Sequence, residues 1–246
     1  MRKHLTQLAL AAAALISLST SANAYMVLTI TDLAVPAGAV TCNTSMASSA
    51  INCGAGFTFF GVNTVLFNGT VNGFSVTTTS GVGNIPGNAV FASLDASTTQ
   101  VRYGGAGIGG LKIDLTGFDY VFPTNAAKSF TGSGSLTSGQ FAAADTVRSD
   151  FYVDGSNTGA LANNLNCTMT VLASNNCNAG SLMWLDGPPA QFSMRTIQTY
   201  SLASGGRVNA TSSSEVGVIP EPASLSLVGL ALLGLGFASR RAAKKA

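Results

Sequence analysis

Short apolar runs separated by turn residues fill the chain from residue 26 to about residue 200. They are rich in Val, Ile, Phe, Tyr and Thr, and several alternate apolar with polar positions. We interpret as strands residues 26–33, 56–62, 63–71, 73–79, 99–104, 111–122, 149–155, 167–173, 191–202 and 206–213. Asn68-Gly69 and Asn72-Gly73 fit tight turns. No sustained helical period occurs between the two ends of the chain, although residues 141–149 fit one short helical turn.

This pattern predicts an all-β fold, a single antiparallel β-sandwich or jelly-roll-like domain of about nine to eleven strands. We place the domain at residues 25–203, followed by a polar tether at residues 204–218, where the last strand fades into small polar residues. The large apolar residues of the runs are the expected core: Phe57, Phe59, Val65, Phe67, Phe74, Val76, Ile113, Leu115, Tyr120, Phe151, Tyr152 and Phe192.

The first 24 residues have the three parts of a secretory signal peptide. Arg2 and Lys3 give a positive start, residues 8–18 form an apolar core, and residues 22–24 form a small-residue cleavage site. We predict cleavage after Ala24. The alternative is a signal anchor that stays uncut, for which the apolar core is short.

Export would place the four cysteines in an oxidising compartment, where an even number predicts disulfides. Three pairings are open for Cys42, Cys53, Cys167 and Cys177, and the spacing favours the local pairs Cys42–Cys53 and Cys167–Cys177. Each pair would contribute roughly 3 kcal/mol in the chain-entropy model. A metal site is the competing interpretation, but neither C-x-x-C spacing nor a histidine partner is present.

Histidine content and charge exclude several classes of function. The only histidine, His4, lies in the signal peptide, so the mature chain has no Ser-His-Asp triad, no Cys-His pair and no zinc site of the usual histidine type. Between residues 25 and 219, six Lys and Arg stand against nine Asp and Glu, a net charge of −3. The overall charge of +2 therefore comes from the two ends, and nothing indicates nucleic-acid binding.

The last segment, residues 219–246, begins with the motif Pro220-Glu221-Pro222. An apolar run of sixteen residues, 223–238, follows, and as a helix it would reach about 24 Å. That length is short of a hydrocarbon core of about 30 Å, but it suffices in a thinned bilayer, so we predict a transmembrane helix. The basic residues that would keep the far end in the cytoplasm are Arg240, Arg241, Lys244 and Lys245.

This three-part layout resembles the PEP-CTERM sorting domain, which has a Pro-Glu-Pro motif, a transmembrane run and a terminal basic cluster. The resemblance covers about 27 residues. It implies export, holding in the membrane, and recognition by an exosortase, a membrane-embedded cysteine transpeptidase-like enzyme, at or near Pro220, Glu221 and Pro222. It also implies an association with the extracellular polysaccharide matrix of Gram-negative bacteria. A permanent single-pass anchor is the alternative.

Two patterns in the body have a possible ligand chemistry beside a structural explanation. Gly105, Gly107 and Gly110 spell G-x-G-x-x-G, but a strand pattern follows them where a dinucleotide loop would open a helix, which favours a β-turn. Trp184, the only tryptophan, could stack on a sugar ring, although a lone Trp in an all-β domain is more often a core anchor.

Acidic residues raise two further hypotheses. Asp150, Asp154 and Asn157 could offer oxygen ligands to Ca²⁺, but the EF-hand order and its bidentate Glu are missing, which favours an Asp-Gly turn. Asp114 and Asp119 could in principle form a glycosidase pair. We interpret them instead as surface turn residues, because the only glutamate of the body falls in the predicted tether.

We therefore expect an exported cell-surface or extracellular-matrix protein with a structural or adhesive role and no enzymatic activity, cofactor or metal. Its partners would be the export machinery, an exosortase and the membrane, with extracellular polysaccharide as a further candidate. The intermediate would be anchored in the inner membrane before it reaches the surface. The alternative is an exported hydrolase or carbohydrate-binding module with the same tail, which an acid/base pair in one pocket would favour.

Overall fold

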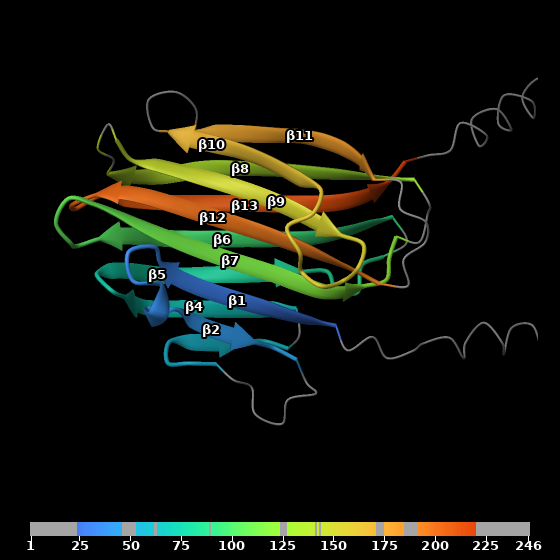
Figure 1. Ribbon diagram of the computed structural model, residues 1–246, viewed down its shortest axis with the longest axis horizontal. Helices are drawn as coiled ribbons and strands as arrows, with labels where there is room; N and C mark the ends of the chain where they lie inside the picture. The colour runs from blue at the N-terminus through green and yellow to red at the C-terminus, as the bar shows by residue number, and fades with distance from the viewer. Residues whose placement is uncertain are drawn as a thin grey trace, which may run out of the picture.

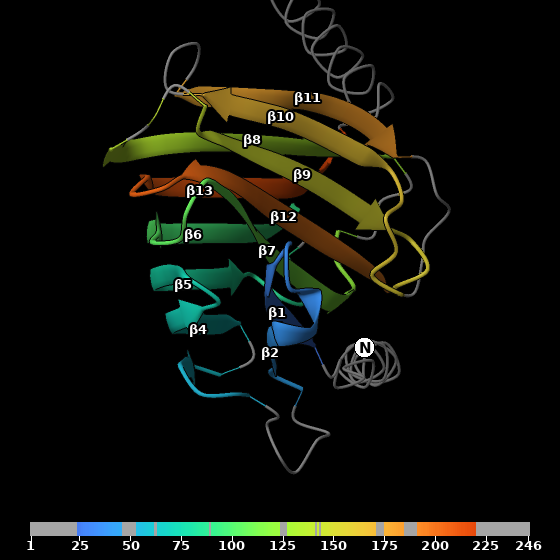
Figure 2. The same cartoon turned by 60° about the vertical axis from the view of Figure 1, so that its left-hand side comes forward.

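The chain folds as a sandwich of two antiparallel β-sheets (Figures 1 and 2). The computed structural model describes residues 24–219, except residues 46–52, 62, 89, 124–126, 141, 143, 171–174 and 185–190. Within this part of the chain the expected all-β sandwich is confirmed, with thirteen strands in place of the predicted nine to eleven.

The six-stranded sheet has the order β10 (Asn164–Thr170), β9 (Thr146–Asp154), β12 (Phe192–Ala203), β7 (Ile108–Tyr120), β1 (Tyr25–Asp32) and β2 (Val40–Asn43). The seven-stranded sheet has the order β11 (Asn176–Trp184), β8 (Lys128–Gln140), β13 (Arg207–Val218), β6 (Phe91–Tyr103), β5 (Phe74–Gly83), β4 (Thr64–Val71) and β3 (Phe57–Phe59). A short 3₁₀ helix, η1 (Pro36–Gly38), lies between β1 and β2.

Alternation of buried and outward side chains explains the layers. In β1, Met26, Leu28 and Ile30 are fully buried and the residues between them are only partly so, because successive strand residues point to opposite faces. The inner faces of the two sheets meet and form the core. The predicted core residues that are buried are Val65, Phe67, Phe74, Val76, Ile113, Leu115, Tyr120, Phe151 and Phe192.

The other three predicted core residues behave differently. Phe57 is partly buried and packs against the core. Tyr152 was predicted wrongly, because its neighbours Phe151 and Val153 point inward and leave its half-buried ring on the outer face. The side chain of Phe59 lies outside the described residues.

Glycine-rich β8 is a strand that the sequence pattern did not predict. Its Gly132 lies under the ring of Phe151 from the opposite sheet, and a Cβ at this position would overlap that ring. Gly81 of β5 leaves room for Leu115 in the same way. These glycines therefore allow the two sheets to pack closely. Strand propensity, which disfavours glycine, takes no account of such packing.

The turn predictions were right in part. Asn72 and Gly73 have positive φ angles of 43° and 92° and join β4 to β5 as predicted. Asn68-Gly69 instead lies inside β4, where the register with β5 shifts between Phe67 and Gly69 as in a β-bulge. In the segment predicted as a helical turn, Asp145 N donates to Ala142 O at 3.0 Å and β9 begins at Thr146, while residues 141 and 143 lie outside the described residues.

The strand predicted at residues 206–213 is present, but the tether predicted at residues 204–218 is wrong, since β13 continues to Val218 and pairs with β6 on one side and β8 on the other. Its small polar side chains are satisfied inside the sandwich. The Ser212 hydroxyl is 2.7 Å from that of Ser149, and the Ser214 hydroxyl is 3.1 Å from that of Thr196. The polar residues of this segment are therefore buried and hydrogen-bonded, and such residues are compatible with an interior strand.

A buried polar network joins the two sheets around Gln198 of β12, which is fully buried. Its amide donates to Ala96 O at 3.2 Å and to the Ser212 hydroxyl at 2.8 Å. Its carbonyl accepts from the Tyr200 hydroxyl at 2.8 Å and the Thr98 hydroxyl at 3.3 Å. Burial raises the pKa of Tyr200, so this phenol stays a neutral donor.

The strand directions place both exits of the described chain at one end of the sandwich. Tyr25 at the start of β1 pairs with Phe118 near the end of β7, and Val218 at the end of β13 pairs with Lys128 at the start of β8. Since the chain passes directly from β7 to β8, these positions share one end, which we name the exit end (Figure 1). The opposite end, with the β4–β5 and β6–β7 turns, is named the far end.

Candidate functional site

The predicted sorting motif follows directly on the folded body. Val218 N donates to Val90 O at 3.1 Å and Ile219 N donates to Ala127 O at 3.3 Å, so ordered backbone contacts reach the residue before Pro220. The remaining sorting residues lie outside the described residues: Pro220, Glu221, Pro222, Arg240, Arg241, Lys244 and Lys245. Among the residues that the structure describes, no helix is long and apolar enough to cross a membrane, and the predicted span 223–238 is not among them.

At the other exit, Ala24 is buried and leads directly into β1. Residues 1–23, which contain the rest of the predicted signal peptide, lie outside the described residues. Cleavage after Ala24 therefore stays a prediction.

Both predicted disulfides are present, Cys42–Cys53 and Cys167–Cys177. Cys167 belongs to β10 and Cys177 to β11, which are edge strands of different sheets. Cys42 belongs to β2 at the opposite edge of the six-stranded sheet, and Cys53 lies shortly before β3 at the corresponding edge of the other sheet. The two bonds thus join the sheets at both open sides of the sandwich, an arrangement that the spacing alone did not reveal.

A hollow of about 190 Å³ lies on the outer face of the six-stranded sheet, at the β9–β10 connection. Its lining consists of Val27, Thr29, Asp114, Thr116, Phe118, Thr158, Gly159 and Arg195. The antiparallel register aligns Tyr152, Arg195, Thr116 and Val27 across four neighbouring strands, which explains how distant parts of the sequence meet here.

A bidentate ion pair dominates the hollow. Arg195 donates from Nε to Asp114 Oδ1 at 2.8 Å and from Nη2 to Asp114 Oδ2 at 2.6 Å, and its Nη1 donates to Gly159 O at 2.9 Å. Lys112 Nζ lies 3.6 Å from Asp114 Oδ2. Hydrogen bonding to Asp114 raises the pKa of the Arg195 guanidinium. Asp114 is thus a buried strand residue, which corrects its interpretation as a surface turn residue.

Aromatic side chains border the same face. The rings of Tyr25 and Phe118 are stacked with centroids 4.7 Å apart and planes inclined by 12°. Tyr152, on β9, is the cross-strand neighbour of Arg195. Burial, and then the charge of Asp150, raise the pKa of Tyr152, which keeps this phenol neutral. Half-buried aromatic rings can pack against a sugar ring, and fixed hydrogen-bonding groups beside them can bind its hydroxyl groups.

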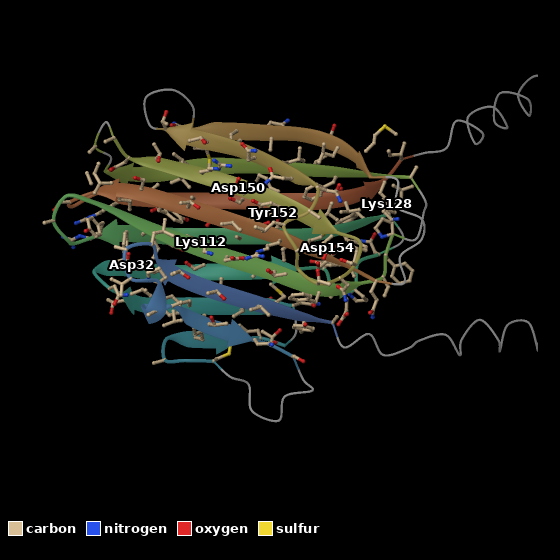
Figure 3. The ribbon with its side chains drawn as sticks, viewed as in Figure 1. Asp32, Lys112, Lys128, Asp150, Tyr152 and Asp154 are labelled. Carbon is tan, nitrogen blue, oxygen red and sulfur yellow. A yellow bond between two sulfur atoms is a disulfide. The ribbon has the colours of Figure 1, made fainter. Side chains whose placement is uncertain are left out.

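The hypothesised calcium ligands do not converge. Asp150 is held by Arg148, whose Nη2 donates to its Oδ1 at 2.7 Å. The Asn157 amide donates to Asp119 Oδ1 at 2.6 Å, so the carboxylate of Asp119, the penultimate residue of β7, is held by a side-chain contact. Figure 3 shows Asp150 and Asp154 at separate positions along β9. In the described part of the chain, no three His, Cys, Asp or Glu gather as metal ligands.

Asp154 begins the Asp-Gly turn that the sequence favoured over calcium binding. Its carboxylate accepts from the backbone N–H of Ser156 at 2.9 Å and of Thr158 at 2.8 Å, and from both hydroxyls. Burial alone would raise the pKa of Asp154, but these hydrogen bonds outweigh it and hold the pKa well below its ordinary value. The carboxylate therefore orders the loop that borders the hollow.

Gly105, Gly107 and Gly110 lie in the β6–β7 connection and the start of β7, and a strand follows them as predicted. Trp184 is the last residue of β11, and its side chain lies outside the described residues.

A second hollow, of about 380 Å³, lies over β8 and β11. Its lining residues are all uncharged: Thr131, Gly132, Ser133, Asn178, Gly180 and Ser181. Arg195 was missed by the sequence analysis, because nothing local marks a partner 81 positions away.

Comparison with known proteins identifies the tail. The PEP-CTERM protein-sorting motif matches residues 218–241, so the chain carries this sorting signal, and the match begins where β13 ends. No curated protein matches the chain.

Several solved structures are distantly similar. TmCBM61 in complex with β-1,4-galactotriose shares 8% identity over 61% of this chain and 92% of its own, with a TM-score of 0.27. A carbohydrate-binding module of the β-sandwich superfamily shares 16% identity over 77% of this chain and 71% of its own, with a TM-score of 0.29. The enzymatically active domain of bacteriophage CBA120 tailspike protein 4 shares 16% identity over 58% of this chain and 20% of its own, with a TM-score of 0.25. Similarity this distant transfers neither ligand nor activity.

Proposed function

We propose that this chain is an exported surface protein, held in the membrane by its PEP-CTERM tail until an exosortase processes it, and that the sandwich has a structural or adhesive role without enzymatic activity. The observation that carries the proposal is the sorting motif at residues 218–241, directly at the end of an interior strand. Its two disulfides fit an oxidising compartment outside the cytoplasm.

The arrangement of carboxylates supports a non-catalytic role. A glycosidase needs two carboxyl groups facing one substrate, one of them able to donate a proton. In the hollow described above, Asp114 is the only acid of the lining, and it is held by Arg195 in two hydrogen bonds. Asp154, close by, accepts hydrogen bonds from its own loop.

Fractionation of cells that contain the sorting enzyme tests the proposal. In the triple variant Pro220→Ala/Glu221→Ala/Pro222→Ala, we expect the protein to stay in the membrane fraction with its basic terminus intact. The parent protein should appear outside the cell with a C-terminus near residue 221, as measured by mass spectrometry. Glu215→Ala is the matched control, because it removes the only other glutamate, on exposed β13 surface. Equal processing of all three proteins would refute the proposal.

Carbohydrate binding by the hollow is the second candidate, and the aromatic residues beside Arg195 and Asp114 favour it. Calorimetric titration with soluble neutral and uronic-acid oligosaccharides tests it. Phe118→Ala should abolish any heat of binding, because it removes the ring that lines the hollow. The control is Tyr103→Ala, which removes a ring that packs against Phe74 at the far end, and this variant should bind as the parent does. A parent protein that binds no sugar, or loses binding equally in both variants, would eliminate this candidate.

A further inference from the structure

Both predicted membrane segments leave the sandwich from the exit end. The signal peptide would precede Tyr25 and the predicted span follows Val218, although these residues belong to different sheets. Only residues 219–222 separate β13 from the apolar run, and four extended residues reach about 14 Å at most. While the chain is anchored, the exit end must therefore lie next to the bilayer surface.

Exposed large apolar side chains are concentrated at this same end. Of the nine such residues among those described, Leu33, Val35 and Ile108 lie at the far end. We name the other six the apolar rim. Phe60, Val90, Phe122 and Leu161 lie in connections at the exit end, and Val82 and Met183 are the penultimate residues of β5 and β11, which end there. Their exposures run from 38% to 70%. Apolar surface gathered on one end of a domain marks an interaction site more than scattered residues do.

The centre of the rim is fixed to the chain exit by backbone contacts. Val90, which is 66% exposed, accepts the hydrogen bond from Val218 N through its carbonyl. Phe122 N donates to Pro86 O at 3.2 Å in the neighbouring connection, and Gly87 packs against the Phe122 backbone. Hydrogen bonds of their own backbone thus hold Val90 and Phe122 beside the point where the tail departs.

Charge at the exit end excludes attraction to anionic headgroups as the main force. In the sequence, the segments that join strands at this end contain no Lys or Arg. They are residues 44–56, 60–63, 84–90, 121–127, 155–163 and 185–191. Asp119, Asp154 and Glu215 lie at or near it. Of the cations near this end, Lys128 at the start of β8 is fully buried, and Arg195 near the start of β12 is paired with Asp114. Any contact with lipid must therefore come from apolar side chains, and it should not depend on anionic lipid.

We propose that the apolar rim docks into the interfacial layer of the bilayer that holds the tail, so that the strands stand away from the membrane and the far end projects outward. This inference rests on the proposed function, because it requires residues 223–238 to span that bilayer. The short connection gives the rim an effective concentration of the order of millimolar, and we expect the affinity of the rim itself to keep it docked when that connection is lengthened. Docking would hold the sorting motif at headgroup level, where a membrane-embedded enzyme can reach it.

Methyl NMR of the mature full chain in phosphatidylcholine nanodiscs tests the docking, with spin labels on the lipid headgroups. We expect the methyl signals of Val90, Leu161 and Met183 to broaden. Ile108, as exposed as Val90 at 63%, is the matched control, and its signal should stay sharp. β13 alone spans roughly 40 Å, which keeps the far end out of reach of the labels.

A second sample separates docking from passive proximity. A flexible Gly/Ser insert between Ile219 and Pro220 lets the sandwich move away from the bilayer while the tail stays in it. If the methyl signals of the rim residues remain broadened in this variant, with or without anionic lipid, the result supports docking. Broadening that disappears with the insert, or that needs anionic lipid, or that affects Ile108 equally, would overturn it. A chain that leaves the nanodiscs altogether would overturn the anchor and the docking together, whereas an anchored chain with sharp Val90 signals overturns the docking alone.

Discussion

Replacing Gln198 by Leu should destabilise the sandwich much more than its similar volume suggests. The amide makes four hydrogen bonds in the interior, and the variant removes all of them. Thr98 and Ser212 retain other hydroxyl partners, Thr79 and Ser149, and can reorient. The buried Tyr200 hydroxyl loses the carbonyl that accepts its hydrogen bond, and its other side-chain neighbour, Thr98, is already paired with Thr79.

The magnitude follows from these contacts. A buried donor that loses its partner costs about 1–3 kcal/mol, and the weakened contacts of the neighbouring groups add to this cost. We therefore expect the free energy of unfolding to fall by about 2–4 kcal/mol. For a domain of this size that corresponds to a fall in Tm of roughly 5–15 °C. Thermal unfolding followed by far-UV circular dichroism measures it, and Gln100→Leu, on less buried β6 surface, should change Tm little.

A double variant isolates the reason for the loss. In Gln198→Leu/Tyr200→Phe the orphaned hydroxyl is absent, so about 1 kcal/mol or more should be recovered relative to the sum of the single variants. Additive effects of the two substitutions, or a Gln198→Leu variant that unfolds at the same temperature as the parent, would show that the Tyr200 hydroxyl does not depend on Gln198.

Two further predictions concern stability. Replacing Cys167 and Cys177 together by Ala should lower the free energy of unfolding by roughly 3 kcal/mol, because the variant lacks the covalent link at one side of the sandwich and its ten-residue loop is no longer closed. Denaturant unfolding of the oxidised parent and variant proteins measures the difference. Since hydrogen bonds depress the pKa of folded Asp154, its carboxylate stabilises the fold above the unfolded pKa of about 3.9, and that stability is lost as pH falls towards the folded pKa. Asp154→Asn should therefore be less stable than the parent at neutral pH and approach it in acid, and a constant difference across pH would contradict the assignment.

Several features were already set by local patterns in the sequence. Alternating apolar residues predicted β1 and β7, because one face of each strand must be buried whatever its partners are. The local cysteine pairs were predicted from loop length, since a short loop is the least costly to close. The sorting tail is a linear signal, so residues 218–241 could be identified without any knowledge of the fold.

Other features depend on which strands become neighbours. Glycine-rich β8 and the polar β13 form strands because Phe151 fills the space above Gly132 and because Ser212 and Ser214 find partners across the interface. The sequence around each of them carries no sign of those partners.

Strand alternation and the motif at residues 218–241 are local patterns, so a β-rich protein with a sorting signal could be recognised before its fold was known. Three other features became visible in the folded chain: Arg195 pairs with Asp114, the disulfides join the sheets at both sides of the sandwich, and both exits share one end with the apolar rim. Register and strand order set these contacts, and both arise from the packing of segments far apart in the chain.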